Sequence, residues 1–339
     1  MDVQKIIDSL KNAGRSRIVV FGDYALDKYL YIDPARDEPS AETGMSAYQV
    51  HRKHLSAGVG GTITNNLRAL GAQVLCIGIV GDDGEGFELL RELDRVGADT
   101  SYMVHEDTMC TCTYTKPMRK GEDGVYRELN RLDFRNFTEP PMSAQQKMMD
   151  NLNAALETAD AVIVTDQFYQ RNLSAVTDWL RGQLSELAAR RRDKVFYADS
   201  RSFADEYRNM MVKCNNLELF SKFSGGAGDP DNLEEIIEKG KRTYLRNGNV
   251  FFVTRGSEGI VVFDGGATVV PAFRVEGEID VVGAGDATNA GIVLGLTLGL
   301  TPAEAALLGC CVSSITIQQI GATGTASPEE VAARLATRL

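Results

Sequence analysis

The chain has 339 residues, 43% of them hydrophobic, which is enough for one large α/β domain with an appendage or for two domains. Its 36 Lys and Arg stand against 47 Asp and Glu, a net charge of −11, so no general electrostatic attraction to nucleic acid or to anionic membranes is expected. The polar, amphipathic segment 1–17 has no apolar signal-peptide core, and no run of about 18 apolar residues follows, which predicts a cytoplasmic protein.

Short apolar segments alternate with helical patterns along the chain. Buried strands are expected at 17–23, 73–83, 160–167, 194–200 and 249–256, and helices at 59–70, 85–96, 172–190 and 231–246. This alternation predicts an α/β fold with a doubly wound, largely parallel sheet flanked by helices. Ligands bind at the carboxyl ends of strands in such sheets. A cleft is therefore expected where polar residues end the strands, at Asp23, Asp83, Asp166, Asp199 and Thr254.

Two segments interrupt this pattern, at 28–57 and 108–134. Both show period-two alternation of β-prone residues and turn signals such as DPARDEPS and RKGEDG. We expect a small antiparallel sheet that closes over the strand ends as a lid, with two decorative hairpins as the alternative. No linker separates these segments from the rest, so residues 1–339 are expected to form a single domain. Apolar positions in KYLYI and CTCTYT would need covering, which predicts a homodimer formed through the lid.

The segment 280–291, DVVGAGDATNAG, runs into an apolar helical pattern. The amides of Gly283, Ala284 and Gly285 can point outward from the start of that helix, where its partial positive charge favours an anion. Asp286 in the first turn could simply cap the helix, or could accept a proton from a hydroxyl that attacks phosphorus. No P-loop motif occurs, and no G-x-G-x-x-G follows the first strand. The segment therefore predicts an anion site with an adjacent general base.

These residues resemble the signature of the ribokinase-like carbohydrate kinases, the PfkB family. D-x-x-G-A-G-D stands at 280–286, and it is preceded by Gly22, Asp23 and Asp27 after the first strand, N-x-x-E at 215–218 and VTRGSEG at 253–259; IGATGT comes near the end. The resemblance covers nearly the whole chain. Within the family, GDYALDKYLYIDPA most resembles the heptose-phosphate kinases. The resemblance implies ATP-dependent phosphorylation of a hydroxyl on a sugar or sugar derivative.

The resemblance also implies roles for individual residues. Asp286 would be the catalytic base, with Gly283, Ala284 and Gly285 as the anion hole. Glu218 would organise Mg²⁺ through water, although it could merely lie on a helix face, and Asp280 would hold a monovalent cation such as K⁺, although it could equally cap the helix. Sugar-side residues would be Asp23, Asp27, Asp166 and Arg201. Nucleotide-side residues would be Asn215, Thr254, Gly256 and Gly259, with Ile320, Gly321 and Thr323 near the adenine.

One family element is altered in this chain. The family commonly carries GG-x-x-N at the start of the helix after the first lid segment. Gly58, Val59 and Thr62 occupy these positions here, and a glycine pair appears two residues later. Either Thr62 replaces the asparagine, or Asn65 serves through a shifted loop. The orientation of the substrate is left open by this change.

The substrate is also left open by charged residues in or near the lid. A basic cluster could bind a sugar phosphate or a sugar acid, or it could be solvated. Arg201 follows Asp199 at a position that resembles D-P-[KR] of related sugar kinases. A non-catalytic sugar or nucleotide sensor on the same fold, a nucleoside kinase and an NAD-linked oxidoreductase are the alternatives, the last weakened by the missing dinucleotide motif. The charged residues concerned are Asp37, Glu38, Glu42, Arg52, Lys53, Lys116, Arg119 and Arg131.

Overall fold

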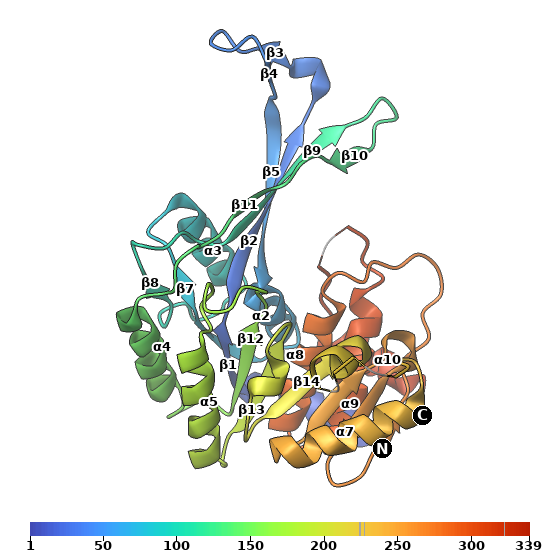
Figure 1. Ribbon diagram of the computed structural model, residues 1–339. Helices are drawn as coiled ribbons and strands as arrows, with labels where there is room; N and C mark the ends of the chain where they lie inside the picture. The colour runs from blue at the N-terminus through green and yellow to red at the C-terminus, as the bar shows by residue number, and fades with distance from the viewer. Residues whose placement is uncertain (224, 227, 322) are drawn as a thin grey trace.

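An eight-stranded sheet forms the centre of the computed structural model, which describes residues 1–339 except 224, 227 and 322 (Figure 1). The strand order is β17-β16-β15-β14-β13-β12-β1-β6. Strands from β15 to β6 pair in parallel, and β15, β16 and β17 pair antiparallel at one edge. The predicted largely parallel sheet is confirmed. Its strands are β1 Arg17–Gly22, β6 Gln73–Ile77, β12 Ala161–Asp166, β13 Val195–Ser200, β14 Met211–Asn215, β15 Phe251–Thr254, β16 Ile260–Phe263 and β17 Thr268–Val270.

Helices cover both faces of this sheet, which explains its continuous apolar strands. In β1, the buried Ile18 and Val20 belong to one hydrophobic cluster and Val19 and Phe21 to the other, because successive side chains of a strand point to opposite faces. The first cluster includes residues of α1 Val3–Leu10, α2 Gly60–Ala69, α3 Gly84–Arg95, α8 Ala284–Thr297, α9 Pro302–Thr316 and α10 Pro328–Ala336. The second includes residues of α4 Met142–Ala155, α5 Asp178–Arg190 and α7 Leu233–Asn247.

A second sheet, called here the lid sheet, projects beyond the carboxyl end of β1 (Figure 1). The two interrupting segments supply its strands, but the first extends beyond 28–57, because β2 follows β1 after a single residue. One pairing differs from the expected antiparallel arrangement: β2 and β9 run parallel, since both lead outward from the body. The strands are β2 Tyr24–Ile32, β5 Val50–Val59, β9 Thr113–Lys120, β10 Tyr126–Glu128 and β11 Leu132–Phe134, in the order β10-β9-β2-β5 with β11 also paired to β9.

Shorter elements complete the described part of the chain. They are the strands β3 Glu38–Pro39, β4 Ser46–Ala47, β7 Ile79–Val80 and β8 Val104–His105, the helical turns η1 Ala13–Arg15, η2 Pro34–Arg36, η3 Ala204–Glu206, α6 Asn216–Glu218 and η5 Gly256–Glu258, and the π-helical turn η4 Leu219–Phe223. Across the residues that the structure describes, we find no helix with both the length and the apolar character needed to cross a bilayer.

Candidate active site

Two cavities meet at the amino-terminus of α8. The lid-side cavity, of about 410 Å³, lies between the lid sheet and the main sheet. The helix-side cavity, of about 400 Å³, lies against α9 and β15. Consecutive residues of α8 divide between them: Gly283 and Asp286 line the lid-side cavity, whereas Ala284 and Gly285 line the helix-side cavity. The predicted anion site therefore lies at the junction of two separate spaces.

The backbone at this junction is open to a ligand. Gly283 has φ +79°, the left-handed conformation that favours glycine, and caps α8 without a side-chain hydrogen bond. The amide of Ala284 donates to the carbonyl oxygen of Val281 at 3.1 Å, so this member of the expected anion hole is engaged within its own turn. Among the described residues, the amides of Gly283 and Gly285 have no such backbone partner. Together with the amide of Asp286, which also has no backbone partner among the described residues, these two amides are left to meet an anion.

Asp286 carries a carboxyl group suited to proton transfer. It is half-buried in the wall of the lid-side cavity. Burial, assisted by the negative charge of Asp199, raises the pKa of Asp286 to about 7, whereas Lys213 and Arg201 act to lower it. A pKa close to the working pH is favourable for a general base.

Lys213, which the sequence analysis did not single out, is the buried cation of the site. It ends up 7% exposed on β14, with its ammonium 3.2 Å from each carboxylate oxygen of Asp199. A Cβ built on Gly285 would lie 3.6 Å from this ammonium, so Lys213 stands beside the anion site. Asn289 completes the network by donating to Asp199 at 2.6 Å. The available signal was a lysine inside the apolar run MVKCN, directly before N-x-x-E.

Asn215 and Glu218 of the N-x-x-E segment form a reciprocal cap, in which each side chain accepts a hydrogen bond from the other residue's amide. The side-chain oxygen of Asn215 accepts from the amide of Glu218, and a carboxylate oxygen of Glu218 accepts from the amide of Asn215, both at 2.8 Å. Burial raises the pKa of Glu218. Neither residue lines the two cavities, and in the described part of the chain no group of three or more His, Cys, Asp or Glu could hold a metal. Glu218 thus fits an outer contact to hydrated Mg²⁺ better than direct ligation.

Asp27 lines the lid-side cavity. One of its oxygens accepts from the ammonium of Lys116 at 2.7 Å, and Lys116 also donates to the hydroxyl of Tyr29 at 3.0 Å. The other oxygen faces Gly58, where a Cβ would come within 2.4 Å. Glycine at this position therefore leaves room for the carboxylate.

Asp23 and Asp166, both expected at the sugar, are placed elsewhere. Asp23 is 1% exposed, and its two oxygens accept from the amides of Gln167 and Ala175 at 2.8 and 3.0 Å. Asp166 is fully buried and accepts from Arg181, Ser200 and Tyr207 within 3.0 Å. Neither lines the lid-side cavity. These carboxylates anchor the loop 167–175 and helix α5: both oxygens of Asp23 and one oxygen of Asp166 accept hydrogen bonds from the protein, while the other oxygen of Asp166 is buried without a partner among the described residues.

The two candidates at the altered family element differ in position relative to the lid-side cavity. Thr62 lines the lid-side cavity, and a Cβ on Gly283 would lie 3.4 Å from its methyl group, whereas Asn65 is not among the residues of the cavity wall. Val59 also lines the cavity and has φ +59°, an unfavourable backbone for a β-branched residue. The shifted glycine pair, Gly60 and Gly61, begins α2 instead.

The helix-side cavity holds the expected loop after β15. Thr254, Gly256 and Gly259 line it, and Gly259 has φ +90° with the carbonyl of Val270 so close that no side chain fits. The other expected adenine neighbours differ. Ile320 is 52% exposed and outside the wall, and the cavity is lined instead by Cys310, Ser313, Ser314 and Ile317 near the end of α9.

Thr323 lies on the other side of the junction, whereas Gly321 lines neither cavity. Thr323 lines the lid-side cavity beside Gly283 and is not among the residues of the helix-side cavity. Asp280 explains the path: its carboxylate accepts from the amides of Val282 and Gly321 at 3.0 and 3.2 Å, and this directs the chain past the start of α8. Residue 322 lies outside the described residues. Neither amide belongs to α8, so these hydrogen bonds do not cap that helix, and the oxygens of Asp280 retain further acceptor capacity.

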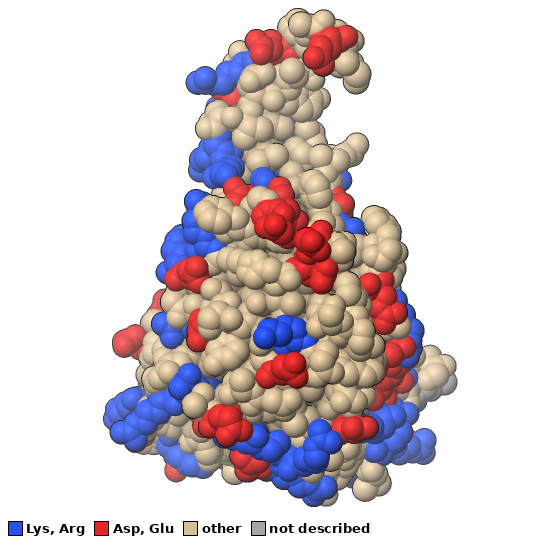
Figure 2. Space-filling model, turned by 90° about the vertical axis from the view of Figure 1, so that its left-hand side faces the viewer, with Lys and Arg blue, Asp and Glu red and all other residues tan. Residues whose placement is uncertain are grey.

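Arginines and aromatic rings form the far wall of the lid-side cavity. Arg131 lies over the ring of Tyr114 at 4.7 Å and pairs with Asp133 through two hydrogen bonds. Arg201 lies over Tyr169 at 5.3 Å, and Arg135 also belongs to this wall. Other lid charges lie outside the cavity: Arg119 pairs with Asp37, Lys53 pairs with Glu88, and Arg52 stacks on Tyr31. Figure 2 shows basic and acidic side chains mixed along the lid and body surface.

Comparisons with known proteins cover nearly the whole chain. The profile described as "pfkB family carbohydrate kinase" matches residues 16–330. "Bifunctional protein HldE" of Trichlorobacter lovleyi is 30% identical over 336 residues, covering 97% of this chain and 65% of that protein, so this chain spans just under two thirds of its relative. Arabidopsis thaliana ribokinase complexed with ribose and ATP has TM-score 0.70 at 18% identity, covering 94% of this chain and 98% of that one. Escherichia coli phosphofructokinase-2 in complex with potassium has TM-score 0.71 at 15% identity, covering 95% and 98%. The chain belongs to the pfkB family of carbohydrate kinases.

Proposed function

We propose that this protein transfers the γ-phosphoryl group of ATP to a hydroxyl of a sugar that already carries an anionic group, a sugar phosphate above all. The observation that carries the proposal is the meeting of two cavities at the start of α8. ATP in the helix-side cavity would direct its phosphates at the amides of Gly283 and Gly285. A sugar in the lid-side cavity would place a hydroxyl beside Asp286.

Asp286 would act as the general base. The sugar hydroxyl loses its proton to the Asp286 carboxylate as its oxygen forms a bond to the γ-phosphorus, and the bond from that phosphorus to the bridging oxygen of ADP breaks. Lys213 and the free amides of Gly283 and Gly285 would stabilise the charge on the migrating group. Asp27, held by Lys116, would accept hydrogen bonds from other hydroxyls of the sugar.

Metal ions would supply further charge neutralisation. Mg²⁺ bound with ATP supplies positive charge at the phosphates, and the reciprocal cap of Asn215 and Glu218 would hold its waters. Asp280 would face a monovalent cation, for which potassium in the related phosphofructokinase-2 structure is the precedent.

The anionic group of the sugar would bind the arginine wall of the lid-side cavity. Among the described residues Arg201 has no carboxylate partner, and the Nε atom of Arg135 is buried without a hydrogen-bond partner. Such donors match a phosphate, which can accept from both arginines. The relatives named HldE and the resemblance of the first lid segment support a phosphorylated substrate of the heptose-phosphate type. A cytoplasmic location and a homodimer through the lid sheet complete the proposal.

A screen of ATP consumption over sugars, sugar phosphates, sugar acids and nucleosides tests this function. We expect turnover with a sugar phosphate and none above background with nucleosides, and an Asp286→Asn variant as matched control should bind ATP without turnover. ATP binding with no substrate in any class would favour the sensor alternative. Turnover of nucleosides alone would overturn the substrate assignment while leaving the kinase in place.

A further inference from the structure

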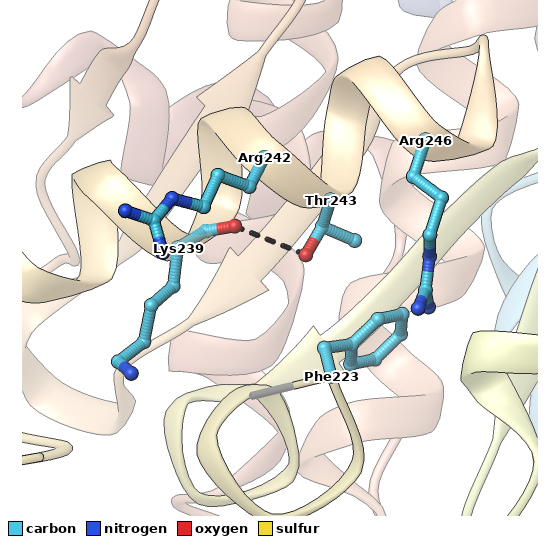
Figure 3. A pocket seen from close by; sticks show the side chains of 5 residues that line it. All are labelled: Phe223, Lys239, Arg242, Thr243 and Arg246. Atoms are coloured by element: carbon cyan, nitrogen blue, oxygen red, sulfur yellow. Dashed lines mark hydrogen bonds between the residues drawn. The ribbon is translucent and has the colours of Figure 1, made fainter. Parts of the chain in front are cut away.

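A third cavity lies apart from the two that meet at α8. It has a volume of about 150 Å³ and lies between α7 and the end of η4, with walls formed by Phe223, Lys239, Arg242, Thr243 and Arg246 (Figure 3). None of these residues lines the lid-side or helix-side cavity. The proposed kinase reaction therefore makes no use of them.

The cavity carries an excess of positive charge. Lys239, Arg242 and Arg246 are spaced three and four residues apart, so they share one face of α7. Arg242 is paired with Glu238. Across the described residues, by contrast, no carboxylate lies within ion-pairing distance of Lys239 or Arg246, and Arg246 makes only a long contact, 3.4 Å, with the carbonyl oxygen of Asp205. Two cations thus remain without a counter-charge.

Lys239 and Arg246 lie on either side of Thr243 in the wall of this cavity (Figure 3). Figure 3 shows the side chains of Lys239 and Arg246 descending from the helix to either side of Thr243, with the ring of Phe223 beneath. Thr243 is 6% exposed, and its hydroxyl donates to the carbonyl of Lys239 at 3.0 Å, which fixes this part of the wall. Aromatic rings support both cations, Phe220 at 4.7 Å from the Lys239 ammonium and Phe223 at 5.6 Å from the Arg246 guanidinium.

We propose that this cavity binds a small phosphate-bearing anion at a site separate from the kinase reaction. An ammonium point charge and a planar guanidinium fork on opposite sides are a complementary pair of phosphate donors. The cavity volume of about 150 Å³ is enough for a phosphate group and is less than half that of either cavity at α8. Phe223 ends η4, which begins directly after Glu218, so the anion would contact the short helix next to the proposed Mg²⁺ residue.

Phosphate titration of the full chain by isothermal calorimetry tests this site without relying on kinase activity. The variant Lys239→Gln/Arg246→Gln removes both free cations, and Lys241→Gln/Arg190→Gln removes two exposed cations outside the three cavities as a matched control. Titrations at constant ionic strength use inorganic phosphate in one arm and glycerol phosphate, a monoester, in the other, which separates a free ion from an esterified ligand.

We expect wild type and the control to bind inorganic phosphate or glycerol phosphate. The Lys239→Gln/Arg246→Gln variant should bind the same ligand at least about tenfold more weakly, because it loses two charge-assisted hydrogen bonds. Binding retained by that variant would belong to the anion site at α8. Identical titration curves for wild type and variant, or no phosphate binding by wild type, would overturn the proposal. Far-UV circular dichroism checks that each variant is folded, and Lys239→Gln alone serves if the double variant is not.

Discussion

The role of Asp286 as general base can be tested through the charge of its neighbour Asp199. Burial and that charge hold the pKa of Asp286 at about 7. If the Asp286 carboxylate accepts the proton, kcat/KM must fall as pH drops through this pKa, because the protonated acid cannot act as a base. Replacing Asp199 by Asn removes the like charge and leaves Lys213 facing Asp286. The pKa of Asp286 must then fall, and the acidic limb of the profile must move to lower pH.

The size of this shift follows from the contacts of Asp199. A neighbouring charge shifts a pKa by about 1 to 3 units, and we take the lower end, about one unit, because Lys213 already partly neutralises Asp199 at 3.2 Å. The ionised fraction of Asp286 at pH 6 would then rise from about 9% to about 50%, so the ratio of kcat/KM at pH 6 to that at pH 8 would increase about fivefold.

The assay follows ADP release across the acidic limb with the best substrate from the screen. Each profile is normalised to its own plateau, since Asp199→Asn also disturbs Lys213 and lowers the absolute rate. Asp193→Asn, which alters an exposed carboxylate paired with Arg191, should leave the profile unchanged. The reasoning is refuted by a limb that stays in place or moves to higher pH in Asp199→Asn.

Three further predictions concern the charges and the lid. Lys213→Gln should lower kcat by about 10² to 10³ with little change in sugar KM, because it removes a cation beside the proposed anion hole. A wild-type kcat for this variant in steady-state assays would show that Lys213 has only a structural role. EDTA should abolish activity, and activity in metal-free buffer would contradict the requirement for Mg²⁺. K⁺ should stimulate activity relative to Na⁺, and equal activity with the two ions would contradict the monovalent cation site. Deleting residues 33–46 should raise ATP hydrolysis relative to sugar phosphorylation, because water enters, and should shift light scattering toward monomer. Unchanged hydrolysis and sugar KM would exclude the lid role, and a monomeric wild type at micromolar concentration would exclude the dimer.

Most of the main sheet could be predicted because its strands are buried on both faces. Such strands are continuous apolar runs, as in β1, and need no information from distant residues. Strand β14 was missed because Lys213 interrupts its apolar run. That lysine is tolerated only because Asp199, on the neighbouring strand β13, faces it with both oxygens. A buried ion pair across two strands leaves no local pattern in either segment.

The candidate site was predictable where its geometry is local. Glycines before an apolar helix predict an open helix terminus, and Asp286 in the first turn follows from that. The sequence could not show which strand-end carboxylates line the cavity, because Asp23, Asp27 and Asp166 all follow or precede similar apolar runs. The structure separates them by their partners: backbone amides bind Asp23, Arg181 binds Asp166, and of the three only Asp27 lines the lid-side cavity. Those partners come from loops more than a hundred residues away or from the next helix, beyond the reach of a local pattern.

The division of α8 between two cavities gives a geometric reason for the spacing of its first residues. Successive side chains of a helix are about 100° apart around its axis, so residues in one turn can face different spaces. Gly285 faces the helix-side cavity and the neighbouring Asp286 faces the lid-side cavity. A phosphoryl group held at the free amides would therefore have the donor nucleotide on one side and the acceptor hydroxyl with its base on the other. In-line displacement requires that attacking and leaving oxygens lie on opposite sides of phosphorus. A carboxylate at position 285 would face the helix-side cavity, and one at the buried position 287 would face neither cavity, so a base for a hydroxyl in the lid-side cavity would have to follow Gly285 directly.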